Sequence, residues 1–339
     1  MQEREWVSSM DKVAQLPARE RNELFADTAA AMKTVPSMTE KDFWVVWVLD
    51  KLFSHPRLKN ILQFKGGTSL SKAFNLIGRF SEDIDLILDW REVTDGDPQE
   101  QRSRTQQHKF NETVNERAKV YIKGKILPEV SALLAPLCGC EIKDDGFSIG
   151  VRYPSEIKDD YLRPEILLEI GPLASWSPSA VFPIRSYAAS YNPQVFVRPE
   201  CLVPTILAKR TFWEKATILH QEAHRAQEQP MPLRHARHYY DLAWLARAQD
   251  IRQEALRDLA LLKEVADFKQ QFYSAAWAKY ELAKPGSFKL LPPKTRFFEL
   301  QTDYQKMQSM IFDKKISLDD IMETLGQLEK EINVLEVDA

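Results

Sequence analysis

The spacing of apolar and polar positions divides the chain into three parts. Helical periodicity marks residues 17–33 and the apolar run Phe43–Leu49, and Thr39 followed three residues later by Asp42 predicts a helix that begins at Thr39. Short runs in the middle of the chain alternate as strands do. We expect strands at 61–64, 83–89, 140–142, 147–153, 165–170 and 195–197. Beyond residue 204 the helical period returns, with breaks near 284–286 and 292–293.

The connections complete this plan. Lys143–Gly146 predicts a hairpin turn, and the polar stretch 91–109 predicts a loop before a helix over 110–134. The sequence therefore predicts an α+β protein. We expect a helical extension at 1–38, a core of strands and helices at 39–200 and a helical domain at 201–339, joined near 198–204.

The amino-acid composition excludes several classes of protein. The chain has 339 residues, of which 44% are hydrophobic, so disorder is excluded; its length is near the limit for one core. Its 46 basic against 49 acidic residues give no overall attraction to nucleic acid or membrane. The three cysteines are irregularly spaced, which favours a reducing compartment. The sequence has no signal-peptide pattern and no apolar run of about 20 residues, the length that a membrane span needs. We therefore expect a cytoplasmic protein without a membrane partner.

Glycine is scarce, with 11 residues, yet Gly66 and Gly67 are adjacent. They follow an expected strand and precede apolar positions at helical spacing, which are Leu70, Ala73, Phe74 and Ile77. A helix beginning at Thr68 or Ser69 would place free backbone N–H groups at the glycines, which suits a phosphate. The same pattern also fits an ordinary turn from strand to helix.

Acidic residues follow at strand spacing. Ile84, Leu86 and Leu88 share one face of the expected strand, so Asp83 and Asp85 point together from the other. Two such carboxylates suit Mg²⁺, although a solvated edge strand has the same pattern. Arg79 either neutralises a phosphate or pairs with these acids.

A third acid lies in a later strand. Glu169 is the one charge inside the run Ile166–Ile170, and a carboxylate is costly to bury there unless it is paired or binds a metal. The alternative is a glutamate at a strand end that reaches solvent.

The segments Gly66–Leu70 and Arg79–Leu86 together resemble the AbiEii/AbiGii toxin family of nucleotidyltransferases, which have the DNA-polymerase-β type of fold. The resemblance implies a polymerase-β-type core with a mixed sheet and a helical C-terminal lobe. It also assigns roles: Gly66, Gly67, Thr68, Ser69 and Arg79 would hold the triphosphate, and Asp83, Asp85 and Glu169 would bind Mg²⁺ or Mn²⁺.

Two later motifs also match the family. Lys209 lies on a helical stripe with Leu202, Ile206 and Trp213, and the family has a triphosphate-contacting lysine at this point; the alternative is a lysine whose stem only covers the core. In Arg234–Leu242 the family has two acids, and here His238 replaces the first. Asp241 is then the candidate to orient the acceptor or act as base, unless it pairs with Arg237.

Basic residues gather in two stretches. Residues 198–238 hold seven Lys or Arg against four Asp or Glu, and 279–296 hold five against one. Either stretch could contact RNA, and solvated helix faces explain each equally well. His220 and His224 do not have the spacing of a known zinc motif.

The leading hypothesis is a metal-dependent transfer of NMP from an NTP to an acceptor hydroxyl. The resemblance implies a toxin with a cognate antitoxin, a role in phage defence, and an RNA acceptor such as the 3′ end of tRNA. Three alternatives stay open: nucleotidylation of a protein, a nucleotide-sugar glycosyltransferase, and a non-catalytic RNA- or partner-binding module. The glycosyltransferase accounts for Asp83 and Asp85 but not for the glycine pair.

Overall fold

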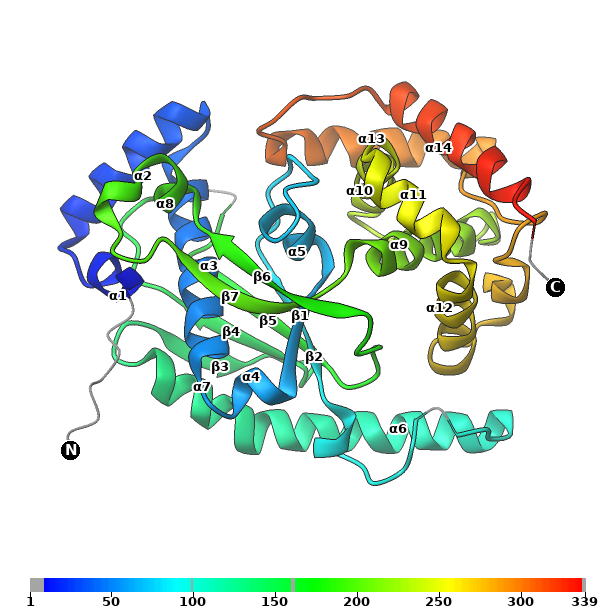
Figure 1. The fold of residues 1–339 in the computed structure, drawn as a ribbon, viewed down its shortest axis with the longest axis horizontal. Helices are drawn as coiled ribbons and strands as arrows, with labels where there is room; N and C mark the ends of the chain where they lie inside the picture. The colour runs from blue at the N-terminus through cyan, green and yellow to red at the C-terminus, as the bar shows by residue number, and fades with distance from the viewer. Residues whose placement is uncertain (1–8, 99, 160–161, 337–339) are drawn as a thin grey trace. The chain divides into compact units, whose positions relative to one another are not determined.

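A computed structural model describes residues 9–98, 100–159 and 162–336 (Figure 1). Its internal contacts group the chain into two compact units. The α/β unit contains the chain up to Ala73 and residues Phe80–Ile206, and the helical unit contains Phe74–Arg79 and Leu207 onward. The three-part division at residues 38 and 200 stays a prediction.

The α/β unit is built on one sheet of seven strands in the order β3-β4-β5-β2-β1-β7-β6. The strands are β1 (Leu62–Lys65), β2 (Ile84–Leu88), β3 (Gly139–Ile142), β4 (Ser148–Arg152), β5 (Glu165–Gly171), β6 (Ser179–Arg185) and β7 (Glu200–Ile206). The pairs β2–β5 and β1–β7 are parallel and the others antiparallel, which confirms the mixed sheet.

Helices surround this sheet. They are α1 (Ser9–Ala14), α2 (Ala18–Met32), α3 (Pro36–Ser54), α4 (Leu58–Ile61), α5 (Gly66–Lys72), α6 (Arg104–Tyr121), a π-helical turn (Ile122–Ile126), α7 (Leu127–Leu134) and α8 (Tyr187–Tyr191). Helix α3 crosses one face of the sheet, and its rings Phe43, Trp44 and Trp47 are fully or almost fully buried (Figure 1). Because this helix is buried on every side, it forms the centre of the core.

Several elements differ from the sequence predictions. Helix α3 begins at Pro36 rather than Thr39, since proline is well suited to a first turn, and the Thr39 hydroxyl donates to the carbonyl of Phe25 at 2.8 Å. The strand expected at 195–197 was wrong, because the chain there forms the 3₁₀ turn Pro193–Val195. Strands β6 and β7 were not expected, and β7 occupies residues assigned to a helical stripe.

The boundaries of other elements are closer to the sequence predictions. The helix expected at 110 already begins at Arg104, where Ser103 and Gln106 form a capping box. Helix α5 ends at Lys72, so Phe74 and Ile77 lie beyond it. The hairpin turn is confirmed: the Gly146 N–H donates to the Lys143 carbonyl at 3.0 Å. The first five expected strands are also confirmed, as β1 to β5.

The helical unit consists of α9 (Ala208–Ala223), α10 (Ala236–Arg247), α11 (Gln249–Arg257), α12 (Leu259–Phe272), α13 (Phe297–Met307) and α14 (Leu318–Asn333). Short 3₁₀ turns lie at Trp90–Glu92 in the first unit and at Ala276–Ala278, Tyr280–Leu282, Lys294–Arg296 and Gln308–Met310 in this one. Residues 74–79 join it through Gly78, whose carbonyl accepts from the N–H groups of Phe312 and Asp313. No helix in the described ranges has the length and apolar character needed to span a membrane.

Candidate active site

Two adjacent strands bring the predicted acids to one face of the sheet. In the parallel pair β2–β5, Asp85 lies opposite Glu169, so the two side chains extend from the same face as neighbours. Asp83 precedes Asp85 by two residues, and Ile84 and Leu86 are buried on the opposite face, as the alternation predicted. Asp85 is half-buried and Glu169 is exposed. This face therefore offers carboxylate oxygens within reach of solvent.

The glycine turn lies directly against the acid strand. Gly66 follows β1 with a φ of +82°, a conformation that favours glycine. A Cβ atom at Gly66 would stand 1.9 Å from Oδ2 of Asp85. The register explains this approach, since Lys65, the last residue of β1, pairs with Asp85. The backbone of the turn and the carboxylate of Asp85 thus border the same small space.

The hydroxyls after the glycines hold this turn in place. Thr68 donates from Oγ1 to the carbonyl of Asp83, and its hydroxyl lies 2.9 Å from that of Ser81. Ser69 donates from Oγ to the carbonyl of Gly66 at 2.8 Å. Both side chains are buried. Thr68 and Ser69, which the sequence suggested as triphosphate ligands, therefore tie the turn to the acid strand, and a ligand role for them stays a prediction.

Charged residues at the start of α3 fix the same two segments, and sequence reasoning missed them. Lys41, 3% exposed, pairs with Glu82, the residue before Asp83. Asp42 is enclosed; it pairs with Lys72 at the end of α5 and accepts from the backbone N–H of Tyr187 at 2.6 Å. Burial raises the pKa of Asp42 and lowers that of Lys72. The available signal was three consecutive charges directly before the apolar run Phe43–Leu49.

In the helical unit, Asp241 forms a buried ion triad. Arg79 donates to both of its oxygens, at 2.7 and 2.8 Å, and Lys215 Nζ lies 2.8 Å away. Burial alone would raise the pKa of Asp241, but these two cations outweigh it and lower the pKa to about 2. Arg237, the partner that its i, i+4 spacing suggested, is exposed. A direct role for Arg79 or Asp241 toward nucleotide or acceptor stays a prediction.

His238, which stands where the family has an acid, extends this triad. Its Nδ1 lies 3.1 Å from Lys215 Nζ. Burial, together with the neighbouring cations, lowers the pKa of His238 well below its usual value. A lower pKa favours the neutral ring, in which Nδ1 can accept a hydrogen bond from Lys215. A second acid at this position would add a negative charge, whereas histidine leaves Asp241 as the counter-ion of Lys215 and Arg79.

Lys209 lies in the first turn of α9. Its Nζ is 2.8 Å from Oδ2 of Asp258, and hydrogen bonding to the lysine lowers the pKa of that aspartate. The helical stripe assigned to it was wrong, because Leu202 and Ile206 belong to strand β7. Contact of Lys209 with a triphosphate stays a prediction from the family resemblance.

Comparison with known proteins settles the family. The sequence model of the nucleotidyl transferase AbiEii toxin family, of type IV toxin–antitoxin systems, matches residues 47–324. The chain belongs to this family. Among solved structures, it is similar to MenT4, a nucleotidyltransferase toxin from Mycobacterium tuberculosis H37Rv, with 19% identity over 91% of this chain and 99% of that one and a TM-score of 0.44. No curated protein matches the chain.

Membership in the AbiEii family implies an NTP substrate and, in most members, a divalent metal. The donor set on the sheet fits a hard cation, because Asp85 and Glu169 are adjacent in register and Asp83 lies on the same face. The missing Cβ of Gly66 lets the Asp85 carboxylate pack directly against the backbone of the turn. Within the described part of the chain, no three His, Cys, Asp or Glu side chains are already gathered as a metal site.

Proposed function

We propose that this toxin transfers an NMP group from an NTP to an acceptor hydroxyl at the face formed by Asp83, Asp85 and Glu169. The observation that carries the proposal is the register of Asp85 with Glu169 beside the glycine turn. A divalent cation bound there, Mg²⁺ or Mn²⁺, would supply charge neutralisation for the triphosphate and a lower pKa for the attacking hydroxyl.

The protein's own groups have distinct parts in this proposal. Asp83, Asp85 and Glu169 hold the cation through their oxygens. Gly66 lets the backbone of the turn lie directly against the Asp85 carboxylate, so that a triphosphate on the cation would also be next to the turn. Lys41 and Asp42 of α3 act as positioning residues, because they fix the segments that carry Asp83 and the turn.

For the acceptor we propose RNA, at the 3′ end of tRNA, in a toxin–antitoxin and phage-defence setting with a cognate antitoxin. The family description supports the toxin–antitoxin part. The basic stretch 198–238 gives little support for RNA contact, because several of its cations are already paired within the chain. Arg198 pairs with Asp50, Lys209 with Asp258, Arg210 with Glu214 and Glu264, and Arg225 with Glu222.

The test supplies each labelled NTP with total RNA and determines the mass of the product. We expect RNA heavier by one NMP, with transfer lost in Asp85→Asn and Glu169→Gln but kept in the control Asp144→Asn, an exposed hairpin carboxylate. Label in protein instead would identify protein nucleotidylation. Consumption of nucleotide sugars with intact NTP would identify a glycosyltransferase. No transfer from any NTP would contradict the proposal.

A further inference from the structure

A hollow of about 490 Å³ lies beside α6 and the π-helical turn, beyond the carboxyl end of β2. It is lined by Glu92, Val93, Glu116, Arg117, Val120, Tyr121, Gly124 and Lys125. The predicted catalytic acids lie at the other end of β2, and five strand residues span about 17 Å. The hollow is therefore separate from the face that carries Asp83 and Asp85.

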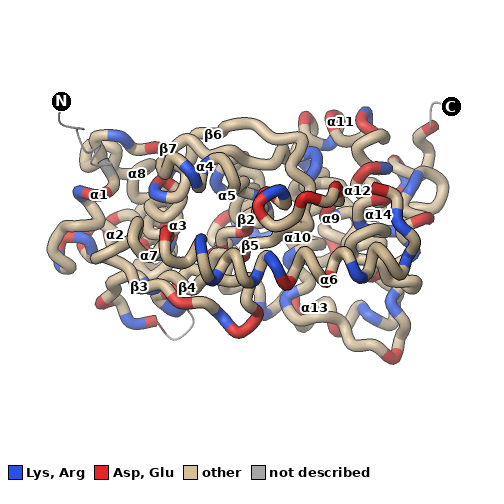
Figure 2. Tube along the Cα trace, turned by 90° about the horizontal axis from the view of Figure 1, so that it is seen from below, with Lys and Arg blue, Asp and Glu red and all other residues tan. Residues whose placement is uncertain are grey.

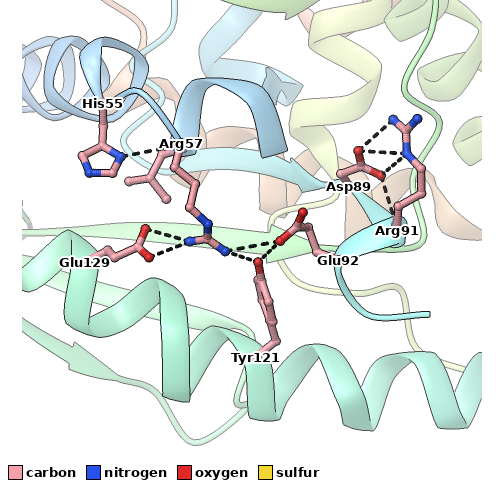
Figure 3. Close-up of polar contacts among 8 residues, drawn as sticks. His55, Arg57, Asp89, Arg91, Glu92, Tyr121 and Glu129 are labelled. Atoms are coloured by element: carbon pink, nitrogen blue, oxygen red, sulfur yellow. Dashed lines mark hydrogen bonds and ion pairs between the residues drawn. The ribbon is translucent and has the colours of Figure 1, made fainter. Parts of the chain in front are cut away.

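The acids around this hollow are paired with side chains of the same unit. Figure 3 shows Arg57 between Glu129 and Glu92, donating to Glu129 at 2.6 and 2.8 Å and to Glu92 at 3.2 Å. The hydroxyl of Tyr121 also donates to Glu92. Glu116, on the same helix, pairs with Lys119 at 2.7 Å. Arg57 balances one of its two glutamates and Lys119 balances Glu116, so these three carboxylates keep a net charge of −1.

The basic residues at the rim of the hollow, in contrast to these acids, are not paired within the described ranges. Arg117 and Lys125 line the hollow, and Lys123 lies in the same π-helical turn as Lys125. All three are exposed, and the described residues include no acidic partner for any of them. Figure 2 shows Lys and Arg positions along α6, with Asp and Glu positions among them, in the view from below. Against the residual −1 of the paired acids, these three positive charges leave this side of the hollow with a net charge of +2.

The walls between these charges are apolar and aromatic. The side chain of Val120 is 73% exposed, Val93 lies across the hollow, and the hydrogen bonds of the Tyr121 hydroxyl fix its ring. A Cβ atom at Gly124 would meet nothing within 4 Å, so the wall is open there. Irregular π-helical turns such as this one occur often at functional sites. Fixed rings beside cations are the surface that single-stranded RNA uses, with bases on the ring and phosphates on the cations.

We propose that this hollow binds a single-stranded segment of the acceptor RNA, several nucleotides away from the reacting hydroxyl. The inference rests on the proposed function in one respect, namely that the acceptor is RNA. Phosphates would contact Arg117, Lys123 and Lys125, and a base would lie against Tyr121 and Val120.

Binding of labelled tRNA to the full chain without NTP tests the inference, with affinity measured by fluorescence anisotropy from 50 to 300 mM salt. The variant Arg117→Gln/Lys125→Gln removes two rim cations. Its control, Lys12→Gln/Arg163→Gln, removes an exposed lysine and arginine that have no acidic partner in the described structure. We expect the slope of log affinity against log salt to become less negative by about 1.4 in the first variant only. The affinity of that variant for tRNA should also fall about tenfold.

A second variant keeps the test decisive if the first is poorly folded. Gly124→Glu places a carboxylate in open space at the hollow and should weaken tRNA binding without removing a cation. In transfer assays both variants should raise KM for tRNA yet leave transfer to a trinucleotide unchanged, since a trinucleotide cannot span both places.

The outcomes separate the two proposals. Equal tRNA binding by the rim variant and its control overturns this inference while transfer to RNA still stands. Unchanged tRNA binding with lost binding to phosphatidylserine vesicles also overturns it and identifies a membrane-facing surface. Failure of the wild-type chain to transfer NMP to any RNA removes the proposed acceptor, whatever the binding result.

Discussion

Replacing Gly66 with alanine tests the closeness of the glycine turn to the acid strand. The new Cβ would stand 1.9 Å from Oδ2 and 2.6 Å from Cγ of Asp85, whereas real Cβ contacts stay beyond 3.0 Å. The carboxylate must therefore withdraw by about 1 Å. A displacement of that size in a catalytic group costs about 100-fold in rate. The left-handed φ adds a destabilisation of about 1–2 kcal/mol.

The assay is a double-mutant cycle. NMP transfer and urea unfolding are measured for Gly66→Ala in the wild-type chain and in an Asp85→Ala background, where the two closest atoms are gone and the remaining Cβ lies 2.9 Å away. We expect kcat to fall about 100-fold in the wild-type background. The free energy of unfolding should fall by more in the wild-type background than in the Asp85→Ala background.

A matched control is Gly139→Ala, where a Cβ atom meets nothing within 4 Å. It should change neither kcat nor stability appreciably. The reasoning is refuted if Gly66→Ala costs the same stability in both backgrounds, because the carboxylate would then not be the obstacle. It is also refuted if the Gly66→Ala chain keeps its full transfer rate.

Other consequences concern buried charges and thiols. Asp241→Asn should cost about 3–5 kcal/mol in urea unfolding, since it leaves two buried cations without their counter-ion. Because the folded pKa of Asp241, about 2, lies below its ordinary 3.8, its stabilisation is present above pH 4 and lost between pH 4 and 2. The wild-type advantage over Asp241→Asn should narrow in that window, and a constant gap would contradict the assignment. Lys72→Met alone should destabilise the chain more than Asp42→Leu/Lys72→Met, because the double variant leaves no unpaired buried charge; the reverse order in thermal melts would argue against the pair. Burial raises the pKa of the Cys138 thiol to about 12, so iodoacetamide at pH 8 should modify it about 10³-fold more slowly in the native than in the denatured chain. Rapid native labelling at this cysteine would disprove its burial.

Local alternation made much of the α/β unit predictable. In β2, apolar residues recur at every second position, and their burial on one face follows directly from the strand period. Strands β6 and β7 gave no such signal, because each contains a proline and β6 lies at the edge of the sheet with five of its seven residues exposed. Edge position is a property of the whole sheet, so a local window does not contain it.

Some features of the candidate site could likewise be predicted from the sequence, and others could not. The acids and the glycine pair could be identified because each motif is short and continuous. The register that puts Asp85 beside Glu169 joins strands far apart in sequence, and the pair of Arg79 with Asp241 spans 162 positions. Neither has a local signature. Lys41 and Asp42 were missed because three adjacent charges at a helix start normally indicate a solvated end, whereas here tertiary packing buries them.

Residues 74–79 belong to the helical unit, although the residues on both sides of them belong to the α/β unit. The two units therefore cannot be separated by cutting the chain at one point. The chain passes between the units after Ala73, after Arg79 and after Ile206. A fragment that stops at residue 206 would keep Arg79 but discard Asp241, its counter-ion. Conversely, a helical fragment that starts at residue 207 would expose Asp241 and Lys215 without the arginine that completes the triad. Splitting this toxin into complementing halves therefore calls for a break in an exposed loop within one unit, not at the boundary between the two.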